Sequence, residues 1–258
     1  MRARIFLIIT TLLCSAVTKS QSYSTANAHS HNDYEQRIPF YAAWKAGFGS
    51  IEADIFLDRG RLIVAHDTIE LKKQFTLDSL YLQPLVSCIS SNNGSVYGNA
   101  SHELILLVDV KTDATSTLKA LVQQLNKYPS LLNTASLKIV ISGNRPAPAD
   151  FTAWPSWMLF DGNPDAAYTN TQLERVGLFS DNFARYSSWR GQNELTVGDR
   201  KTLEDLIAKV HSLHKKIRLW NAPDIENSWM TFMNLRVDYI NTDHIESLSH
   251  FFNQPTTN

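Results

Sequence analysis

The chain is poor in cysteine, lacks a surplus of charge of either sign and has no long apolar run, and each absence excludes a class of protein. Two cysteines among 258 residues are too few for a disulfide-stabilised scaffold. The 24 basic and 25 acidic side chains give a formal net charge of −1, so we do not expect a nucleic-acid partner. No apolar run reaches the ~18 residues of a transmembrane helix. A hydrophobic fraction of 43% predicts a soluble globular protein.

Residues 1–20 have the order of a secretory signal peptide. Arg2 and Arg4 precede the apolar stretch 5–16, and small polar residues follow it up to Ser20. Cleavage there would remove three of the 24 basic side chains and no acidic one, which leaves 21 against 25, a net charge of −4. It would also remove Cys14 and leave Cys88 as the one thiol, so no intramolecular disulfide is expected. We predict an exported protein, periplasmic or secreted, with residues 21–258 as a single domain and no transmembrane segment after signal removal.

Short apolar strands alternate with amphipathic helices along the rest of the chain. The run 104–110 is almost continuously apolar, as expected of a parallel strand that is covered on both faces. Eight strand–helix units in about 240 residues favour an α/β protein with a (β/α)8 TIM-type barrel. The predicted strands are 25–28, 50–57, 104–110, 137–141, 157–160, 176–179, 217–220 and 239–241; the predicted helices are 40–46, 78–87, 116–127, 169–174, 202–214, 225–234 and 244–252.

Polar and ionisable residues follow nearly every predicted strand, which is where a barrel of this class carries its chemistry. The clearest pair is Glu52 and Asp54, two residues apart on one strand, so both point to the same face. Neighbouring carboxylates repel each other unless a cation lies between them. Oxygen ligands suit Ca²⁺ or Mg²⁺ better than zinc. The strand ends also carry residues 29–33, Asp109, Lys111, residues 142–145, Asp161, Trp220, Asn221 and Asp243.

Two segments carry histidines suited to proton transfer. A hairpin through residues 58–60 would bring His66 beside the strand of Glu52, with Asp67 expected to orient the imidazole. The first strand is followed by His29-Ser30-His31-Asn32, which allows two interpretations. His29 and His31 could both bind a transition metal, as in amidohydrolase or histidinol-phosphatase-type barrels. Alternatively, one histidine is a general acid or base and Asn32 offers its amide oxygen to a hard cation, an arrangement that fits the carboxylates better.

The motifs together resemble the phospholipase C-like phosphodiesterases, which include glycerophosphodiester phosphodiesterases and phosphatidylinositol-specific phospholipases C. The similarity is densest over residues 29–67, and residues 109–111 and 237–243 add to it. The segments that carry it are His31-Asn32-Asp33-Tyr34, Glu52-x-Asp54, Val64-x-His66-Asp67, Asp109-x-Lys111 and Val237-Asp238-Tyr239-Ile240-Asn241-Thr242-Asp243. One departure concerns residues 31–33, because glycerophosphodiesterases usually have His-Arg-Gly there and this chain has no arginine at that place.

The resemblance implies a (β/α)8 barrel that cleaves a small-molecule or lipid phosphodiester with two histidines and a divalent cation. On this chain it implies His31 and His66 as the catalytic pair, and Asn32, Glu52, Asp54 and Asp109 as ligands of Ca²⁺ or Mg²⁺. Lys111, on the same side of its strand as Asp109, would bind a phosphate oxygen or else form a surface salt bridge. Trp220 and Asn221 would line the head-group site. Contact with a membrane surface is compatible with a lipid substrate. The alternatives are a transition-metal hydrolase using His29-x-His31 and a non-catalytic barrel that binds a phosphoester.

Overall fold

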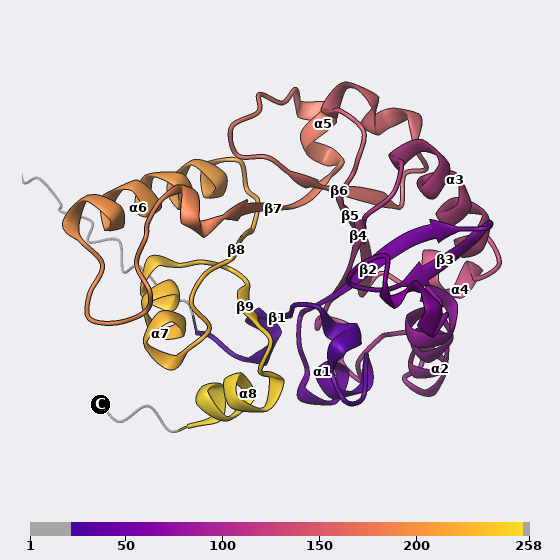
Figure 1. Cartoon of the computed structure of the whole chain (residues 1–258), viewed down its shortest axis with the longest axis horizontal. Helices are drawn as coiled ribbons and strands as arrows, with labels where there is room; N and C mark the ends of the chain where they lie inside the picture. The colour runs from indigo at the N-terminus through magenta and orange to yellow at the C-terminus, as the bar shows by residue number, and fades with distance from the viewer. Residues whose placement is uncertain (1–21, 255–258) are drawn as a thin grey trace, which may run out of the picture.

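The computed structural model describes residues 22–254, which form a nearly closed barrel of eight parallel strands with helices between them (Figure 1). The expected signal peptide lies outside the described residues. The strands follow one another in the order β8-β7-β6-β5-β4-β2-β1-β9, and β3 pairs antiparallel with β2. Their bounds are β1 Ala28–Ser30, β2 Ser50–Asp58, β3 Arg61–Val64, β4 Leu104–Val110, β5 Leu137–Gly143, β6 Met158–Gly162, β7 Val176–Asn182, β8 Ile217–Trp220 and β9 Ile240–Thr242.

The barrel closes between β8 and β9 through a single bridge, Arg218 to Tyr239. The carboxylate of Asp238 strengthens this seam, because its Oδ2 accepts a hydrogen bond from the Ile217 amide (2.9 Å) and lies 2.8 Å from His211 Nε2. A side chain therefore replaces part of the strand ladder at the closure.

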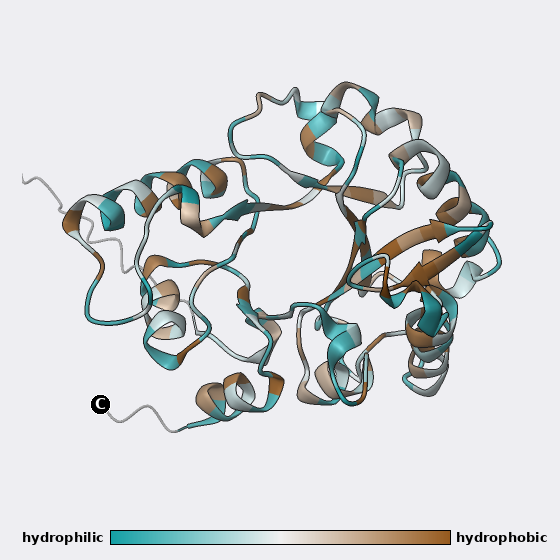
Figure 2. Cartoon of the chain, viewed as in Figure 1, coloured by the Kyte–Doolittle hydropathy of each residue, from teal (hydrophilic) through white to brown (hydrophobic). Residues whose placement is uncertain are grey.

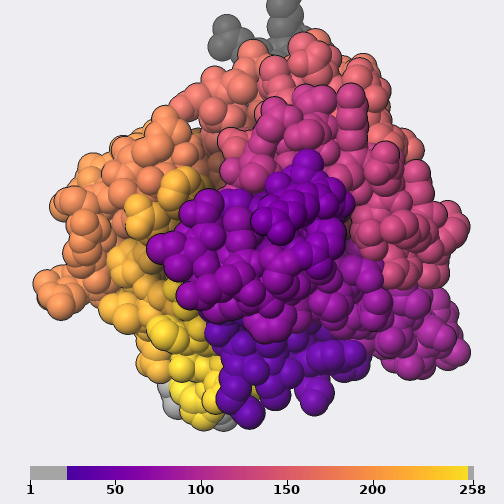
Figure 3. Space-filling model, turned by 45° about the vertical axis from the view of Figure 1, so that its right-hand side comes forward, coloured from indigo at the N-terminus to yellow at the C-terminus, as the bar shows by residue number. Residues whose placement is uncertain are grey.

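Helices surround the barrel, and the first and last of them pack side by side. Figures 1 and 3 show the N-terminal segment with α1 against the C-terminal segment with α8. Among residues 22–254, no helix is long and apolar enough to span a bilayer. The helices are α1 Tyr41–Ala46, α2 Gln83–Ser91, α3 Ala114–Leu125, α4 Pro129–Leu132, α5 Asn170–Glu174, α6 Val197–Ser212, α7 Glu226–Leu235 and α8 Ile245–Asn253. A turn of π-helix, Asp78–Leu82, leads into α2, and 3-10 turns occupy Thr25–Asn27, Asp33–Glu35, Glu70–Lys73, Pro148–Ala153 and Phe183–Arg185.

The eight predicted strands and the hairpin through residues 58–60 are confirmed, although several predicted boundaries differ from the observed ones by a few residues. Two of these differences have a clear local cause. The first strand begins at Ala28, because residues 25–27 form a turn that the Ser24 side chain caps. The helix predicted to open at Thr202 begins five residues earlier, where Thr196 Oγ1 accepts a hydrogen bond from the Asp199 amide. Its first turn is exposed, so no apolar spacing marks it in the sequence.

Alternation along the strands divides the buried side chains into two groups. Those that point outward, such as Leu106 and Val108 of β4, pack under the helices in the main core. Those that point inward near the start of the strands form a second apolar cluster of Ile105, Leu107, Val140, Leu178 and Tyr239. Apolar residues accordingly concentrate on the strands, while the connecting loops are mostly hydrophilic (Figure 2). Beyond this inner cluster the barrel interior becomes polar, and the candidate site begins there.

Candidate functional site

A pocket of about 440 Å³ opens at the carboxyl ends of the strands. It brings together eight of the nine residues that the sequence nominated; Asn221 is not in its lining. Asn221 donates instead to Asn182 Oδ1 (3.0 Å). The lining residues are His31, Asn32, Glu52, Asp54, His66, Asp109, Lys111, Ser142, Gly143, Arg145, Asp161, Asn163, Ser180, Asp181, Arg218 and Trp220.

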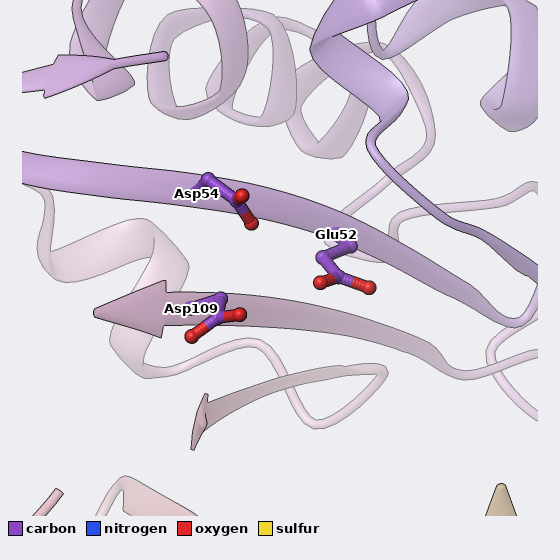
Figure 4. Close-up of side chains that lie close together, drawn as sticks. All are labelled: Glu52, Asp54 and Asp109. Atoms are coloured by element: carbon purple, nitrogen blue, oxygen red, sulfur yellow. The ribbon is translucent and has the colours of Figure 1, made fainter. Parts of the chain in front are cut away.

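Three of these residues form a carboxylate cluster: Glu52 and Asp54 from β2 and Asp109 from the neighbouring β4 (Figure 4). Asp54 pairs in register with Asp109, and one oxygen from each of the three carboxylates lies within 4.8 Å of the others. Asp54 Oδ1 and Asp109 Oδ1 are buried and have no hydrogen-bond partner in the described part of the chain. Buried carboxylate oxygens normally have a partner, so the donor set fits a metal ion.

Lys111 partly neutralises this carboxylate cluster. Its ammonium lies 2.9 Å from Asp54 Oδ2 and 2.8 Å from Asp109 Oδ2. Burial, together with the nearby charge of Glu52, nevertheless raises the pKa of Asp54 to about 6. The ammonium of Lys111 therefore does not fully compensate the neighbouring carboxylates, and further positive charge is favoured there.

Asp109 can lie in the carboxylate cluster because a glycine faces it. Gly143, at the end of β5, has a φ of +67°, and a Cβ atom built on it would be 1.8 Å from Asp109 Oδ1 and 2.6 Å from the Val110 carbonyl oxygen. Any side chain at residue 143 would displace the carboxylate.

The third carboxylate, Glu52, belongs to a buried ion pair. Arg218 of β8 reaches across the barrel and donates from Nη1 to Glu52 Oε2 (2.7 Å), and His29 Nε2 lies 2.7 Å from the same oxygen. The other ring nitrogen of His29 is 2.7 Å from Ser50 Oγ. Burial and the neighbouring Arg218 lower the pKa of His29 to about 3, so His29 is neutral, and its Nε2 contacts both Glu52 Oε2 and Arg218 Nη1. Both of its nitrogens are engaged, which leaves none for a metal.

His31 is held by a carboxylate that follows the end of β9. Its Nδ1 lies 2.7 Å from Asp243 Oδ1. Burial lowers the pKa of His31, but the hydrogen bond with Asp243 and the charges of Glu52 and Asp243 outweigh it, so the pKa lies above its usual value. Asp224 fixes this segment in turn, because its Oδ2 accepts from the Asp243 amide (2.8 Å) and from Thr242 Oγ1 (3.0 Å).

Tyr34 links the second histidine to the carboxylate cluster. Its hydroxyl donates to Asp54 Oδ2 (2.8 Å) and lies 3.0 Å from Asn32 Oδ1 and 3.3 Å from His66 Nδ1. Asn32, two residues after the end of β1, adopts the left-handed conformation, with φ 44°. The expectation that Asp67 orients His66 is wrong: Asp67 Oδ1 instead accepts from the Ile69 and Glu70 amides and fixes the following turn.

The far wall of the pocket carries functional candidates for which the sequence assigned no role. Asp161 at the end of β6 is buried, its Oδ1 has no partner within residues 22–254, and burial raises its pKa to about 6. Arg145 and Ser180 line the same wall. Arg218 had a recognisable signal: it is a charged residue inside the apolar strand 217–220, on the same face as Trp220.

Comparisons with known proteins agree with this architecture. Residues 19–133 match the AIM6-like phosphodiesterase domain family. Two relatives are the altered inheritance of mitochondria protein 6 of Eremothecium gossypii, 27% identical over 86% of this chain and 68% of the relative, and a homologue from Arthroderma benhamiae, 38% identical over 38% and 37%. A glycerophosphodiester phosphodiesterase from Parabacteroides distasonis has a similar structure, with a TM-score of 0.56, 12% identity and coverage of 88% of this chain and 98% of that one. The family match confirms the resemblance to the phospholipase C-like phosphodiesterases, and the structural match confirms the barrel fold.

Proposed function

We propose that this protein is a metal-dependent phosphodiesterase that cleaves a diester of the glycerophosphodiester or phospholipid head-group type. The observation that supports it most is a pair of buried oxygens, from Asp54 and Asp109, that lie beside Glu52 and have no hydrogen-bond partner among residues 22–254. The same pocket also holds His31 and His66. The phosphodiesterase family match over residues 19–133 is consistent with it.

The residues of the pocket match the requirements of phosphodiester cleavage. The reaction needs an activated oxygen nucleophile, relief of negative charge on the non-bridging oxygens and a proton for the leaving alkoxide. Glu52, Asp54 and Asp109, with the Asn32 amide oxygen beside them, would hold Ca²⁺ or Mg²⁺. A bound cation supplies charge relief and fixes the phosphate. Pairing with Asp243 makes His31 a stronger base, and His66, which is more exposed, would protonate the leaving group.

The transition-metal alternative receives no support from the site. In residues 22–254 the group of side chains suited to a metal contains three carboxylates and no histidine. Both nitrogens of His29 are already bound to Ser50 and Glu52.

The central experiment is a panel of glycerophosphodiesters and phospholipids incubated with Ca²⁺, Mg²⁺ or EDTA and followed by ³¹P NMR. We expect turnover with one of the cations, none in EDTA, and loss of turnover in Asp54→Asn and Asp109→Asn. These variants are preferable to Glu52→Ala, which would leave Arg218 buried without its carboxylate and cost about 3–5 kcal/mol. Full activity in EDTA, or in either Asp→Asn variant, would refute the metal assignment.

Diesters with poor and with good leaving groups distinguish the roles of the two histidines. A general acid matters most for a poor leaving group such as glycerol and little for p-nitrophenol. His66→Ala should therefore reduce hydrolysis of an alkyl diester by ~10²–10⁴ and largely spare a p-nitrophenyl diester, whereas His31→Ala should reduce both. Equal losses on both substrates in both variants would remove the assignment of a dedicated acid.

A further inference from the structure

We propose that Arg218 is a phosphate ligand: its Nη2 binds a non-bridging oxygen of the substrate while its Nη1 holds Glu52. This inference rests on the proposed phosphodiesterase function and names the group that recognises the phosphate. The pocket lining contains three cationic side chains, Lys111, Arg145 and Arg218. They differ in their hydrogen-bond and ion-pair partners within the protein.

Lys111 is engaged with two carboxylates, Asp54 and Asp109. Arg145 lies at the exposed edge and donates from Nη1 to the Gly143 carbonyl oxygen (3.2 Å). Arg218 is 4% exposed and lies inside the barrel. A buried guanidinium that still reaches a polar pocket is the least hydrated of the three cations, and its charge acts through the low-dielectric barrel interior.

The guanidinium of Arg218 is hydrogen-bonded through Nε and Nη1, whereas Nη2 is available to a ligand. Nε donates to Ser180 Oγ (3.3 Å), and Nη1 donates to Glu52 Oε2 (2.7 Å) and to Asn241 Oδ1 (3.3 Å). Within residues 22–254 no hydrogen bond engages Nη2, although Arg218 lines the pocket. Because the planar group is fixed by contacts with β2, β7 and β9, the two N–H groups of Nη2 have a set direction and lose little entropy on binding an oxyanion.

Charge in the barrel also favours an anion at Nη2. Glu52, Asp54 and Asp109 carry three negative charges, against one positive charge each on Arg218 and Lys111. The other two carboxylates of the lining are offset, Asp181 by its ion pair with Arg185 and Asp161 by the nearby charge of Arg145. A divalent cation on the carboxylate cluster would change the local balance from −1 to +1, which a phosphodiester monoanion neutralises. Metal and Arg218 would then contact the phosphate from two sides of the pocket.

This arrangement predicts that loss of Arg218 lowers the affinity for phosphate without lowering the affinity for Ca²⁺. Arg218→Gln removes a cation beside Glu52, so affinity for Ca²⁺, measured by calorimetry, should stay the same or rise. Affinity for inorganic phosphate at saturating Ca²⁺ should fall about 10- to 100-fold. Arg236→Gln is the matched control, because it removes the same charge from an exposed residue at the C-terminal end of α7 that does not line the pocket; it should change phosphate affinity less than about twofold.

A parallel loss of Ca²⁺ and phosphate affinity in Arg218→Gln would overturn the proposal, because it would show that Arg218 only supports Glu52. Should Arg218→Gln fail to fold, Arg218→Lys keeps the charge and is expected to bind phosphate more weakly than the native protein. A crystal structure of the native protein with Ca²⁺ and phosphate decides independently: phosphate bound away from Nη2 contradicts the inference. If phosphate binds through Arg218 but no diester of the panel is cleaved, the proposed function fails and the inference stands.

Discussion

At the scale of single residues, the position of Asp109 depends on the glycine opposite it. Gly143→Ala would place a Cβ atom 1.8 Å from Asp109 Oδ1 and would strain a backbone with φ +67°. We expect Ca²⁺ or Mg²⁺ affinity to fall at least tenfold, together with a loss of about 1–2 kcal/mol in the free energy of unfolding.

The variant Gly60→Ala separates the displacement of Asp109 from the strain in the backbone. Gly60 has a similar φ of +79°, but in the described part of the chain no atom beyond its sequence neighbours lies within 4 Å of the position that a Cβ atom would take there. This variant should therefore show the backbone cost alone. Equal metal affinity in the two variants would mean that Gly143 does not position Asp109.

Asp161 gives a prediction about pH at the same scale. Burial raises its folded-state pKa to about 6, well above the ordinary value of 3.8. The folded state therefore binds the carboxyl proton more tightly than the unfolded state does, and protonation stabilises the fold. This contribution to the free energy of unfolding is complete below about pH 4 and is lost as pH rises through 6. Asp161→Asn should therefore be more stable than the native protein at pH 8, by at most about 3 kcal/mol, and the difference should shrink as pH falls toward 4. Urea denaturation across that range tests it; a difference independent of pH would contradict it.

At the scale of elements, Asp224 joins the segment after β8 to the end of β9 and, through Asp243, to His31. Asp224→Ala removes acceptors from the Asp243 amide, Thr242 and Trp229 Nε1, so we expect a loss of about 1–3 kcal/mol in stability. It should also lower kcat on alkyl diesters. In the Asp243→Ala background the same change should barely alter kcat, because the contact with His31 is already absent. Additive losses of kcat would show that Asp224 does not act through Asp243.

At the scale of the whole molecule, we expect the carboxylate cluster to couple folding to metal binding. A cation that binds only the folded protein at 100 times its Kd adds about 2.7 kcal/mol, which corresponds to a rise of about 5–10 °C in Tm for a domain of this size. Asp54→Asn should abolish this rise. It should also raise Tm in EDTA, since it removes a buried carboxyl whose neighbours oppose its charge. A lower Tm of this variant in EDTA would show that Lys111 already compensates Asp54.

Much of the molecule follows from local sequence. Alternation along residues 51–55 determines that Glu52 and Asp54 share a face, because successive strand residues point to opposite sides. The apolar run of β4 and the repeated strand–helix pattern determine the barrel, and the barrel gathers the strand ends. The eight strands and the eight nominated residues that line the pocket could therefore be predicted, whereas Ser180 and Arg218 were not predicted. The assignment of residues 1–20 to a signal peptide stays a prediction.

The partners of each side chain were decided by tertiary structure. Nothing near residue 218 in the sequence indicates that its guanidinium meets Glu52, because β8 and β2 face each other across the interior only when the barrel closes. Likewise Asp243 joins His31 from 212 residues away, while Asp67, which directly follows His66, bonds to its own turn. Strand periodicity is local, because the geometry of each residue sets the direction of the next side chain. Ion pairs between strands instead depend on which strands face each other in the folded barrel. The sequence by itself determined the scaffold and the metal-ligating and acid–base side chains of the site. Closure of the barrel decided which of these side chains act together.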